Sequence, residues 1–181
     1  MKATGIVRRI DDLGRVVIPK EIRRTMRIRE GDPLEIYTDT EGEVIFKKYS
    51  PIGELSNFAL QYAETLHKTC DYSVVITDRD SVIACAGLPK REFMEKKISS
   101  SFISVIEGRQ LHVAAEDSQK VSILDDSERY YGRVIMPIVS EGDIVGSVCI
   151  ASPSEEYKLT DSTELKTVQT AAAFLGKQLE S

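Results

Sequence analysis

The first fifty residues place short apolar runs between turn-forming residues, a pattern typical of small β-rich units. Strand-like residues at positions 5–10 lead through the turn residues 11–14 into a continuous apolar run, Val16, Val17 and Ile18. A strand with one solvated face would alternate apolar and polar residues. This run therefore predicts a strand that is covered on both faces.

A short helix is predicted to follow these strands. Pro19 suits its first position because that position needs no backbone N–H, and Gly31 suits the residue that closes the helix, which places it from Lys20 to about Arg29. At 100° per residue, Ile22 and Met26 share one side. The opposite side is a basic stripe made of Lys20, Arg23, Arg24 and Arg27.

A hairpin comes next, because two strand-like segments at residues 34–37 and 43–46 flank the turn residues 40–42. The first unit is thus predicted to have the order β-β-α-β-β. Fifty residues bury too little apolar surface to offset chain entropy comfortably, and the segment offers no disulfide framework or metal-ligand set. We therefore expect two chains to pair through this unit.

Two later segments carry apolar residues at alternating spacings of three and four, which is a heptad pattern. Asp161 is a plausible N-cap for the second, with Glu164 three residues on. Both helices could join one inter-chain bundle and assemble tetramers, or each could cover a sheet within its own domain. The positions are Ile52, Leu55, Ala59, Tyr62 and Leu66 in the first helix and Leu165, Val168, Ala172, Leu175 and Leu179 in the second.

The region between these helices predicts an antiparallel sheet with flanking helices, an α+β domain. A helical segment at about residues 90–107 interrupts the strands, and a hairpin turns at residues 140–143. The strand candidates are residues 73–77, 81–86, 111–115, 120–124, 133–139 and 144–151.

Charge is distributed unevenly along the chain. Residues 1–29 contain nine Lys and Arg against three Asp and Glu, a net charge of +6, whereas the whole chain carries −5, which leaves −11 for the rest. A basic segment on an acidic protein is a local electrostatic footprint for an anionic partner. This asymmetry predicts that the first unit meets the partner.

Several classes of protein are disfavoured by the inventory of side chains. No stretch approaches the roughly 18 apolar residues of a membrane helix, and the N-terminus lacks a signal-like apolar region, so we expect a soluble cytoplasmic protein. His67 and His112 are isolated, and His67 with Cys70 supplies two ligands where a structural zinc site needs four. No Gly-rich phosphate loop follows a strand, and no serine has an evident base. We predict no enzymatic activity, metal or cofactor.

The three cysteines, Cys70, Cys85 and Cys149, are far apart and odd in number. Each has apolar neighbours in the sequence. This pattern favours reduced, buried thiols over a disulfide framework.

The first fifty residues resemble the DNA-binding domain of the AbrB family of transition-state regulators. The resemblance rests on Gly14-Arg15-Val16-Val17-Ile18-Pro19, Glu21-Ile22-Arg23-Arg24 and Leu34-Glu35-Ile36-Tyr37. It implies a barrel in which two chains interleave hairpins, with Val16, Val17 and Ile18 at the interface. With its long C-terminal extension, the chain is most similar to a sporulation regulator of spore-forming bacteria, which implies action in the developing spore compartment.

The resemblance also implies which side chains contact double-stranded DNA. The positions that match the family's DNA-contacting arginines are Arg8, Arg15, Arg23 and Arg24. Weaker candidates, placed nearby by the basic stripe or by sequence, are Arg9, Lys2, Lys20 and Arg27.

The C-terminal part resembles a GAF domain less closely. The best anchor is Met136-Pro137-Ile138 with Gly142-Asp143 and Ile144-Val145-Gly146-Ser147-Val148, similar to the closing hairpin of such domains. A GAF domain senses a small molecule or serves purely for dimerisation, and the sequence leaves both open, with no ligand named. The expected organisation is a DNA-binding domain at 1–50, a linker or bundle helix at 51–70 and a GAF-like domain at 71–181.

The leading hypothesis is a sequence-tolerant DNA-binding regulator, an activator or a repressor of sporulation genes. The alternative is an antitoxin-type protein, because similar barrels neutralise protein partners through an extended acidic tail. The C-terminal region of this chain is patterned to fold, which favours the first hypothesis.

Overall fold

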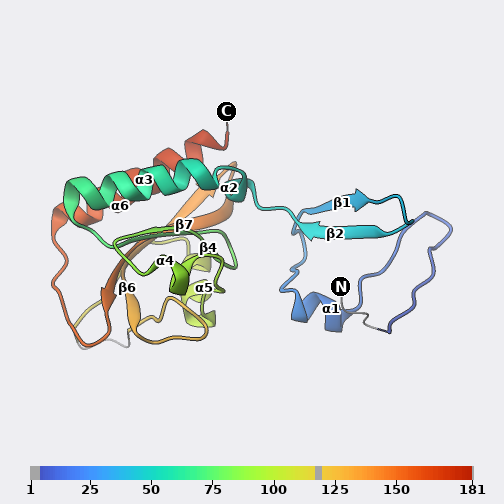
Figure 1. The fold of residues 1–181 in the computed structure, drawn as a ribbon, viewed down its shortest axis with the longest axis horizontal. Helices are drawn as coiled ribbons and strands as arrows, with labels where there is room; N and C mark the ends of the chain where they lie inside the picture. The colour runs from blue at the N-terminus through green and yellow to red at the C-terminus, as the bar shows by residue number, and fades with distance from the viewer. Residues whose placement is uncertain (1–4, 117–119, 181) are drawn as a thin grey trace. The chain divides into compact units, whose positions relative to one another are not determined.

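The structure, a computed structural model, describes residues 5–116 and 120–180. The chain divides into two compact units, Met1–Tyr49 and Ser50–Ser181, and mixes helices with sheets as the sequence predicts (Figure 1). The helix predicted as a separate segment at 51–70 belongs to the second unit. It packs on the sheet of that unit, so the chain has two parts where we expected three.

The first unit contains one short helix and one hairpin. Helix α1 spans Lys20–Thr25, and strands β1 (Leu34–Thr38) and β2 (Val44–Lys48) pair antiparallel, with Leu34 opposite Lys48. The carboxylate of Asp39 accepts the backbone N–H groups of Glu41 and Glu43 and so closes the turn between the strands. The predicted hairpin is confirmed.

The two strands predicted at residues 5–10 and 15–18 do not form within a single chain. Both segments run on either side of a turn at residues 11–14, and neither has a ladder partner among the described residues of the first unit. Val16 and Val17 are exposed, so the prediction of a doubly covered strand is not met by one chain. A strand needs a neighbour for its N–H and C=O groups, and here one chain supplies none.

Helix α1 ends earlier than predicted, at Thr25 instead of near Arg29. Arg27 takes the left-handed conformation (φ 53°), while the N–H of Ile28 donates to the carbonyl of Arg23 at 2.7 Å and the N–H of Arg27 to Arg24 at 3.2 Å. These are the two bonds of a Schellman motif, which satisfies the last carbonyls of a helix. Gly31 therefore lies in the following turn and does not close the helix.

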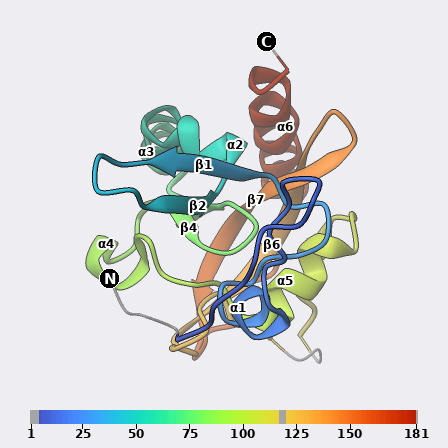
Figure 2. The same cartoon turned by 90° about the vertical axis from the view of Figure 1, so that its right-hand side faces the viewer.

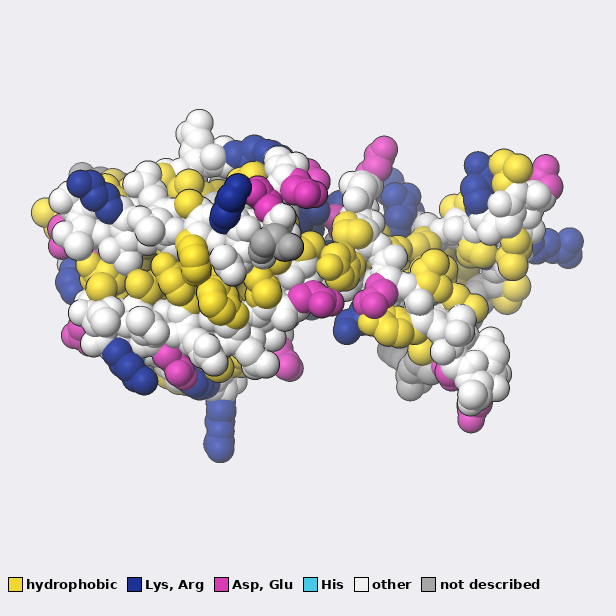
Figure 3. All heavy atoms as spheres, turned by 90° about the horizontal axis from the view of Figure 1, so that it is seen from above, with side chains coloured by type: hydrophobic (Ala, Val, Ile, Leu, Met, Phe, Trp, Pro, Cys, Tyr) yellow, Lys and Arg dark blue, Asp and Glu magenta, His cyan; other side chains and the backbone are white. Residues whose placement is uncertain are grey.

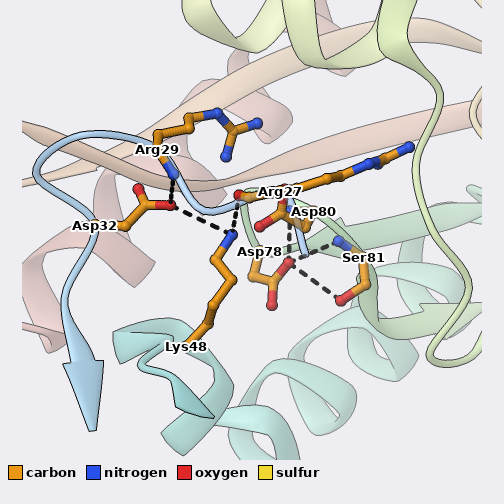
Figure 4. Close-up of polar contacts among 7 residues, drawn as sticks. All are labelled: Arg27, Arg29, Asp32, Lys48, Asp78, Asp80 and Ser81. Carbon is orange, nitrogen blue, oxygen red and sulfur yellow. Dashed lines mark hydrogen bonds and ion pairs between the residues drawn. The ribbon is translucent and has the colours of Figure 1, made fainter. Parts of the chain in front are cut away.

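The second unit is built on a five-stranded antiparallel sheet in the order β4-β3-β7-β6-β5. Strands β6 and β7 are the longest and form the predicted hairpin, with Glu141 and Gly142 at positive φ in its two-residue turn. The turn between β3 and β4 is held by Asp78, whose carboxylate accepts the N–H groups of Asp80 and Ser81 (Figure 4). The strands are β3 (Val74–Thr77), β4 (Val82–Ala86), β5 (His112–Val113), β6 (Tyr130–Ser140) and β7 (Asp143–Pro153).

Helices cover both faces of this sheet (Figures 1 and 2). On one face, Ala59 and Val168 pack with Val148, in a core supplied by α2 (Pro51–Glu54), α3 (Ser56–Cys70) and α6 (Ser162–Gln178). On the other face, Phe93 and Phe102 pack in a second core supplied by α4 (Lys90–Phe93), α5 (Ser100–Glu107) and the following loop. The two cores make the unit a three-layer structure.

The heptad residues divide between the core and the surface. Ile52, Ala59, Val168, Ala172 and Leu175 are buried within the second unit, where these five residues cover its own sheet and are not available to an inter-chain bundle. Spacings of three and four also arise when a helix packs on a sheet, so the pattern alone does not distinguish an inter-chain bundle from packing within one unit. Leu55, Tyr62, Leu66, Leu165 and Leu179 are partly exposed.

Hydrophobic side chains run along the outer face of α3 and α6 (Figure 3). The rings of Phe58, Tyr62 and Phe174 lie there, with centroids 5.6–6.4 Å apart. Aromatic rings at these separations attract one another beyond their buried area. They join the two helices at the surface of the unit.

Two other sequence predictions in this unit need correction. The helical segment at 90–107 is broken into α4 and α5, because Glu95 adopts a positive φ between them and Ser99 begins a new helix as its N-cap. Residues 120–124 form isolated bridges where a strand was predicted, and residues 111–115 contribute the two-residue strand β5.

The start of α6 agrees with the sequence in detail. The Asp161 carboxylate accepts the N–H of Glu164 at 2.8 Å, and the Glu164 carboxylate accepts the N–H of Asp161 at 3.2 Å, which completes the predicted capping box. Glu164 also accepts from buried Arg133 at 2.6 Å. This second partner ties the first turn of α6 to strand β6.

Candidate nucleic-acid interface

The predicted DNA-contacting residues lie on two parts of the first unit. The extended segments around the turn at 11–14 present Arg8, Arg9 and Arg15, and helix α1 presents Lys20, Arg23 and Arg24, all of them exposed. Arg27 is half-buried and stands beyond the end of α1, so it does not extend the basic stripe as predicted. Lys2 lies outside the described residues.

Arg15 is oriented by the turn that precedes it. Asp11 Oδ1 accepts the backbone N–H groups of Leu13 at 3.0 Å and Arg15 at 2.8 Å, while Asp11 Oδ2 accepts Arg15 Nε at 2.8 Å. The Arg15 N–H, followed by its side chain, holds the pKa of the Asp11 carboxyl below its usual value. The Arg15 side chain stays 69% exposed, so the turn fixes the base of the guanidinium and leaves its outer part at the surface.

Arg23 and Arg24 lie in the last turn of α1. Cations at this end interact favourably with the helix dipole, so the fold tolerates two adjacent guanidinium groups. Each arginine also offers its carbonyl oxygen to the Schellman motif. The two side chains therefore project from a segment whose backbone is capped.

Sequence reasoning missed two residues that contact this segment. Lys48 Nζ donates to the carbonyl of Arg27 at 2.9 Å and lies 3.4 Å from the carboxylate of Asp32 (Figure 4). The partners are 21 and 16 positions apart in the chain, so no local pattern relates them. The hairpin, which pairs β2 with the start of β1, is what brings Lys48 to the end of α1.

The second unit contains a half-open hollow of about 330 Å³ lined by polar side chains. Lys120 Nζ lies 4.7 Å from the ring centre of Tyr131 and donates to the carbonyls of Ser154 and Glu156. Among the described residues, no three His, Cys, Asp or Glu side chains are placed to hold a metal ion. Of the cysteines, Cys85 and Cys149 are buried, burial raises the pKa of both thiols, and Cys70 is partly exposed.

None of the helices within residues 5–116 and 120–180 combines the length and apolar character that a membrane crossing requires.

Comparison with known proteins gives two family matches. A model described as the stage V sporulation protein T C-terminal, transcription factor, matches residues 54–180, and a model described as the antidote-toxin recognition MazE, bacterial antitoxin, matches residues 7–53. The first covers most of the chain and coincides with the second unit.

Individual relatives agree with the first match. Stage V sporulation protein T of Bacillus subtilis (strain 168) is 50% identical over 182 residues, 99% of each chain. The transition state regulatory protein AbrB of the same organism is 55% identical over 69 residues, 35% of this chain and 71% of the relative, which confirms the resemblance of the first unit.

A solved structure supports the fold of the second unit. A GAF domain/HD domain protein from Geobacter sulfurreducens superposes with a TM-score of 0.51 at 16% identity, covering 69% of this chain and 91% of the other. At that identity the likeness shows the fold alone, and it confirms the GAF-like architecture.

The model that matches residues 54–180 describes a transcription factor, and the relative that is similar from end to end is the stage V sporulation protein T that this model is named after, so the prediction that the chain is not an enzyme is confirmed. The sporulation regulator predicted from the motifs of the first fifty residues together with the long C-terminal extension is also the one that these comparisons find. The chain belongs to the stage V sporulation protein T family of transcription factors.

Proposed function

We propose that the chain regulates transcription of sporulation genes, as an activator or a repressor, by binding double-stranded DNA through its first unit. The observation that carries the proposal is the set of exposed basic side chains on that unit, within a transcription-factor family. The main contacts are assigned to Arg8, Arg15, Arg23 and Arg24, with Arg9, Lys2, Lys20 and Arg27 in support.

Arginine suits both parts of this task. Its planar guanidinium pairs bidentately with phosphate oxygens or with O6 and N7 of guanine in the major groove. Phosphate contacts supply affinity without sequence preference, and a smaller number of base contacts supplies what specificity there is. A DNA-bound regulator of this kind acts in the cytoplasm, in the developing spore compartment.

The proposal includes a homodimer formed by the first unit. In one chain this unit exposes apolar side chains, among them Val7 at 88% and Val17 at 70%. A strand pair contributed by a second copy would cover Val16, Val17 and Ile18 and supply the missing ladder partners, forming a swapped-hairpin barrel. Two copies also double the number of arginines that face one DNA.

The second unit is proposed to oligomerise the protein and to sense a small molecule. The partly exposed residues Leu55, Tyr62, Leu66, Leu165 and Leu179 support a tetramer built through α3 and α6. Two barrels on one DNA would raise avidity through effective concentration.

Fluorescence anisotropy on promoter duplexes over a salt series tests the proposal. If a dimer engages about eight phosphates, affinity should fall by about 10⁴-fold between 50 and 200 mM salt. Arg23→Ala/Arg24→Ala should weaken binding and flatten the salt slope. The control Lys68→Ala/Arg91→Ala removes the same charge from exposed sites of the second unit and should bind like the parent; equal losses in both variants would contradict the proposal.

The second candidate function is an antitoxin, favoured by the match of the MazE antitoxin model to residues 7–53. Such a role requires a tail that wraps a toxin, whereas residues 50–181 contain two apolar cores. Limited proteolysis distinguishes the two. A persistent fragment spanning the second unit supports the regulator, and rapid degradation of that region supports the antitoxin.

A further inference from the structure

Helix α1 carries Arg23 and Arg24 but has little intrinsic support. It is six residues long, Pro19 provides no side-chain cap at its start, and none of its residues is buried. Isolated helices of this length are unstable in water, because nucleation is unfavourable and most helical stability comes from packing. The position of the two arginines therefore depends on contacts at the end of the helix.

Lys48 supplies one such contact from the neighbouring hairpin. Its Nζ donates to the carbonyl of Arg27 at 2.9 Å (Figure 4). Arg27 is the left-handed residue of the Schellman motif, and the next residue, Ile28, donates to the carbonyl of Arg23 at 2.7 Å. A single ammonium group thus connects strand β2 to the capped turn that bears the arginines.

Asp32 fixes the other side of the same loop. Its Oδ2 accepts the N–H of Arg29 at 2.8 Å and lies 3.4 Å from Lys48 Nζ. The Asp32 side chain is 3% exposed and that of Lys48 25%. A carboxylate this buried needs a counter-charge, and a shielded ion pair is less weakened by salt than an exposed one.

We propose that Lys48 and Asp32 are positioning residues for DNA binding: they hold the C-terminal turn of α1 against β2 and so set the direction of Arg23 and Arg24. The inference rests on the proposed function of those arginines. In this role Lys48 acts through the backbone of Arg27, whereas Lys47, its neighbour on β2, is exposed.

A double-mutant cycle in the full-length protein tests this role. Lys48→Met should weaken DNA binding about tenfold at 100 mM salt, Lys48→Arg should restore most of the affinity, and Lys47→Met should match the parent. In the Arg23→Ala/Arg24→Ala background, Lys48→Met should have no further effect, because coupled residues are not additive. Additive losses, with a salt slope lower by about two per dimer, would show direct phosphate contact and overturn the inference.

Hydrogen exchange without DNA tests the same inference independently of the proposed function. Lys48→Met and Asp32→Asn should speed exchange of the Ile28 amide by about tenfold or more, while amides of β6 and β7 in the second unit stay unchanged and serve as an internal control for folding. Unchanged Ile28 exchange would overturn the positioning role. A parent protein that binds no DNA, combined with faster exchange in Lys48→Met, would instead overturn the function proposed for the arginines.

Discussion

The first unit and the second unit differ in how much apolar surface a single chain can cover. In the second unit two clusters of buried side chains lie on opposite faces of one sheet. Among residues 5–49, Pro19 is the one buried residue, and Val7, Ile10, Leu13 and Val17 are largely exposed. Burial of apolar area is the main favourable term in folding, so the two units must obtain their stability from different sources.

The surface proposed to bind DNA therefore lies on the part of the chain with the weaker core. The second unit is stabilised by its own two apolar cores, whereas for the first unit we propose that a second copy supplies the missing burial. Regions that bind ligands are drawn from the less stable parts of a protein. Substitutions that disturb each unit separately test this difference.

The largest effect is expected from Val17→Asp. In a single chain this side chain is 70% exposed, and a surface substitution of that kind changes stability by less than about 0.5 kcal/mol. If a second copy covers it, the buried carboxylate should abolish pairing, unfold the first unit and reduce DNA affinity at least about 100-fold. Hydrogen exchange resolved by unit measures this, and normal protection in the first unit of the variant would contradict the dimer.

A large loss confined to the second unit is expected from Glu164→Ala. Glu164 and Arg133 form an ion pair at 2.6 Å, with side chains 4% and 3% exposed. Removing one partner leaves a buried charge unpaired, which destabilises by about 3–5 kcal/mol. Urea unfolding of the second unit measures this loss. The exposed pair Lys177–Glu180 is the control, since solvent screens this pair and Glu180→Ala should leave the stability close to that of the parent. Similar losses in both variants would refute the prediction.

Gly146→Ala tests how tightly the sheet of the second unit is packed. A Cβ at this position would collide with the backbone of Thr77 on the neighbouring strand β3, where no side-chain rotation relieves the clash. Overpacking of this kind costs typically 1–3 kcal/mol. Gly142→Ala is the matched comparison, because that glycine has open space and loses about 1 kcal/mol through its positive φ alone. Urea midpoints that rank Gly142→Ala as the more damaging change would contradict this account.

The smallest expected effect is a pH dependence of the stability of the first unit, through the carboxyl group of Asp11. The folded pKa of Asp11 lies below its ordinary value of 3.8 because of the Arg15 N–H and side chain. The contribution of this carboxylate is therefore fully present above about pH 4 and is lost as the pH falls through the lower folded pKa. An NMR titration of the carboxyl carbon should show the depressed pKa. Arg15→Ala should raise this pKa part of the way toward 3.8, because it removes the side-chain hydrogen bond and keeps the backbone N–H. An ordinary pKa in the parent would mean that the turn does not hold Arg15.

The parts of the fold that sequence predicted well are specified by neighbouring residues. The turn at residues 140–143 follows from Gly142, which accepts a positive φ, and the capping box follows from Asp161 and Glu164, three positions apart. The hairpin of the first unit is specified in the same way by its turn residues. In each case the residues that determine the structure lie within a few positions of one another in the chain.

The parts of the fold that the sequence did not predict depend on contacts between residues that are far apart in the chain. Arg133 and Glu164 are 31 positions apart, and Lys48 meets Arg27 across 21, so neither contact leaves a local pattern. The sequence predicts the wrong end for α1, because glycine adopts the left-handed conformation more readily than arginine and Gly31 is therefore the better candidate. In the structure Arg27 adopts that conformation and ends the helix. The exposure of the arginines in the candidate interface could be predicted, because a charged side chain stays in water whether or not a distant residue contacts it.

The left-handed conformation of Arg27 bears on any attempt to raise the thermal stability of this protein. A non-glycine residue in the left-handed region carries a conformational penalty of about 1 kcal/mol, which Arg27→Gly would relieve. The same change deletes a positive charge from a unit proposed to bind a polyanion. Selection for thermal stability alone should therefore favour glycine at position 27 and yield a protein with a higher melting temperature and a lower affinity for DNA. Directed evolution of this chain would have to screen heat resistance and promoter occupancy together.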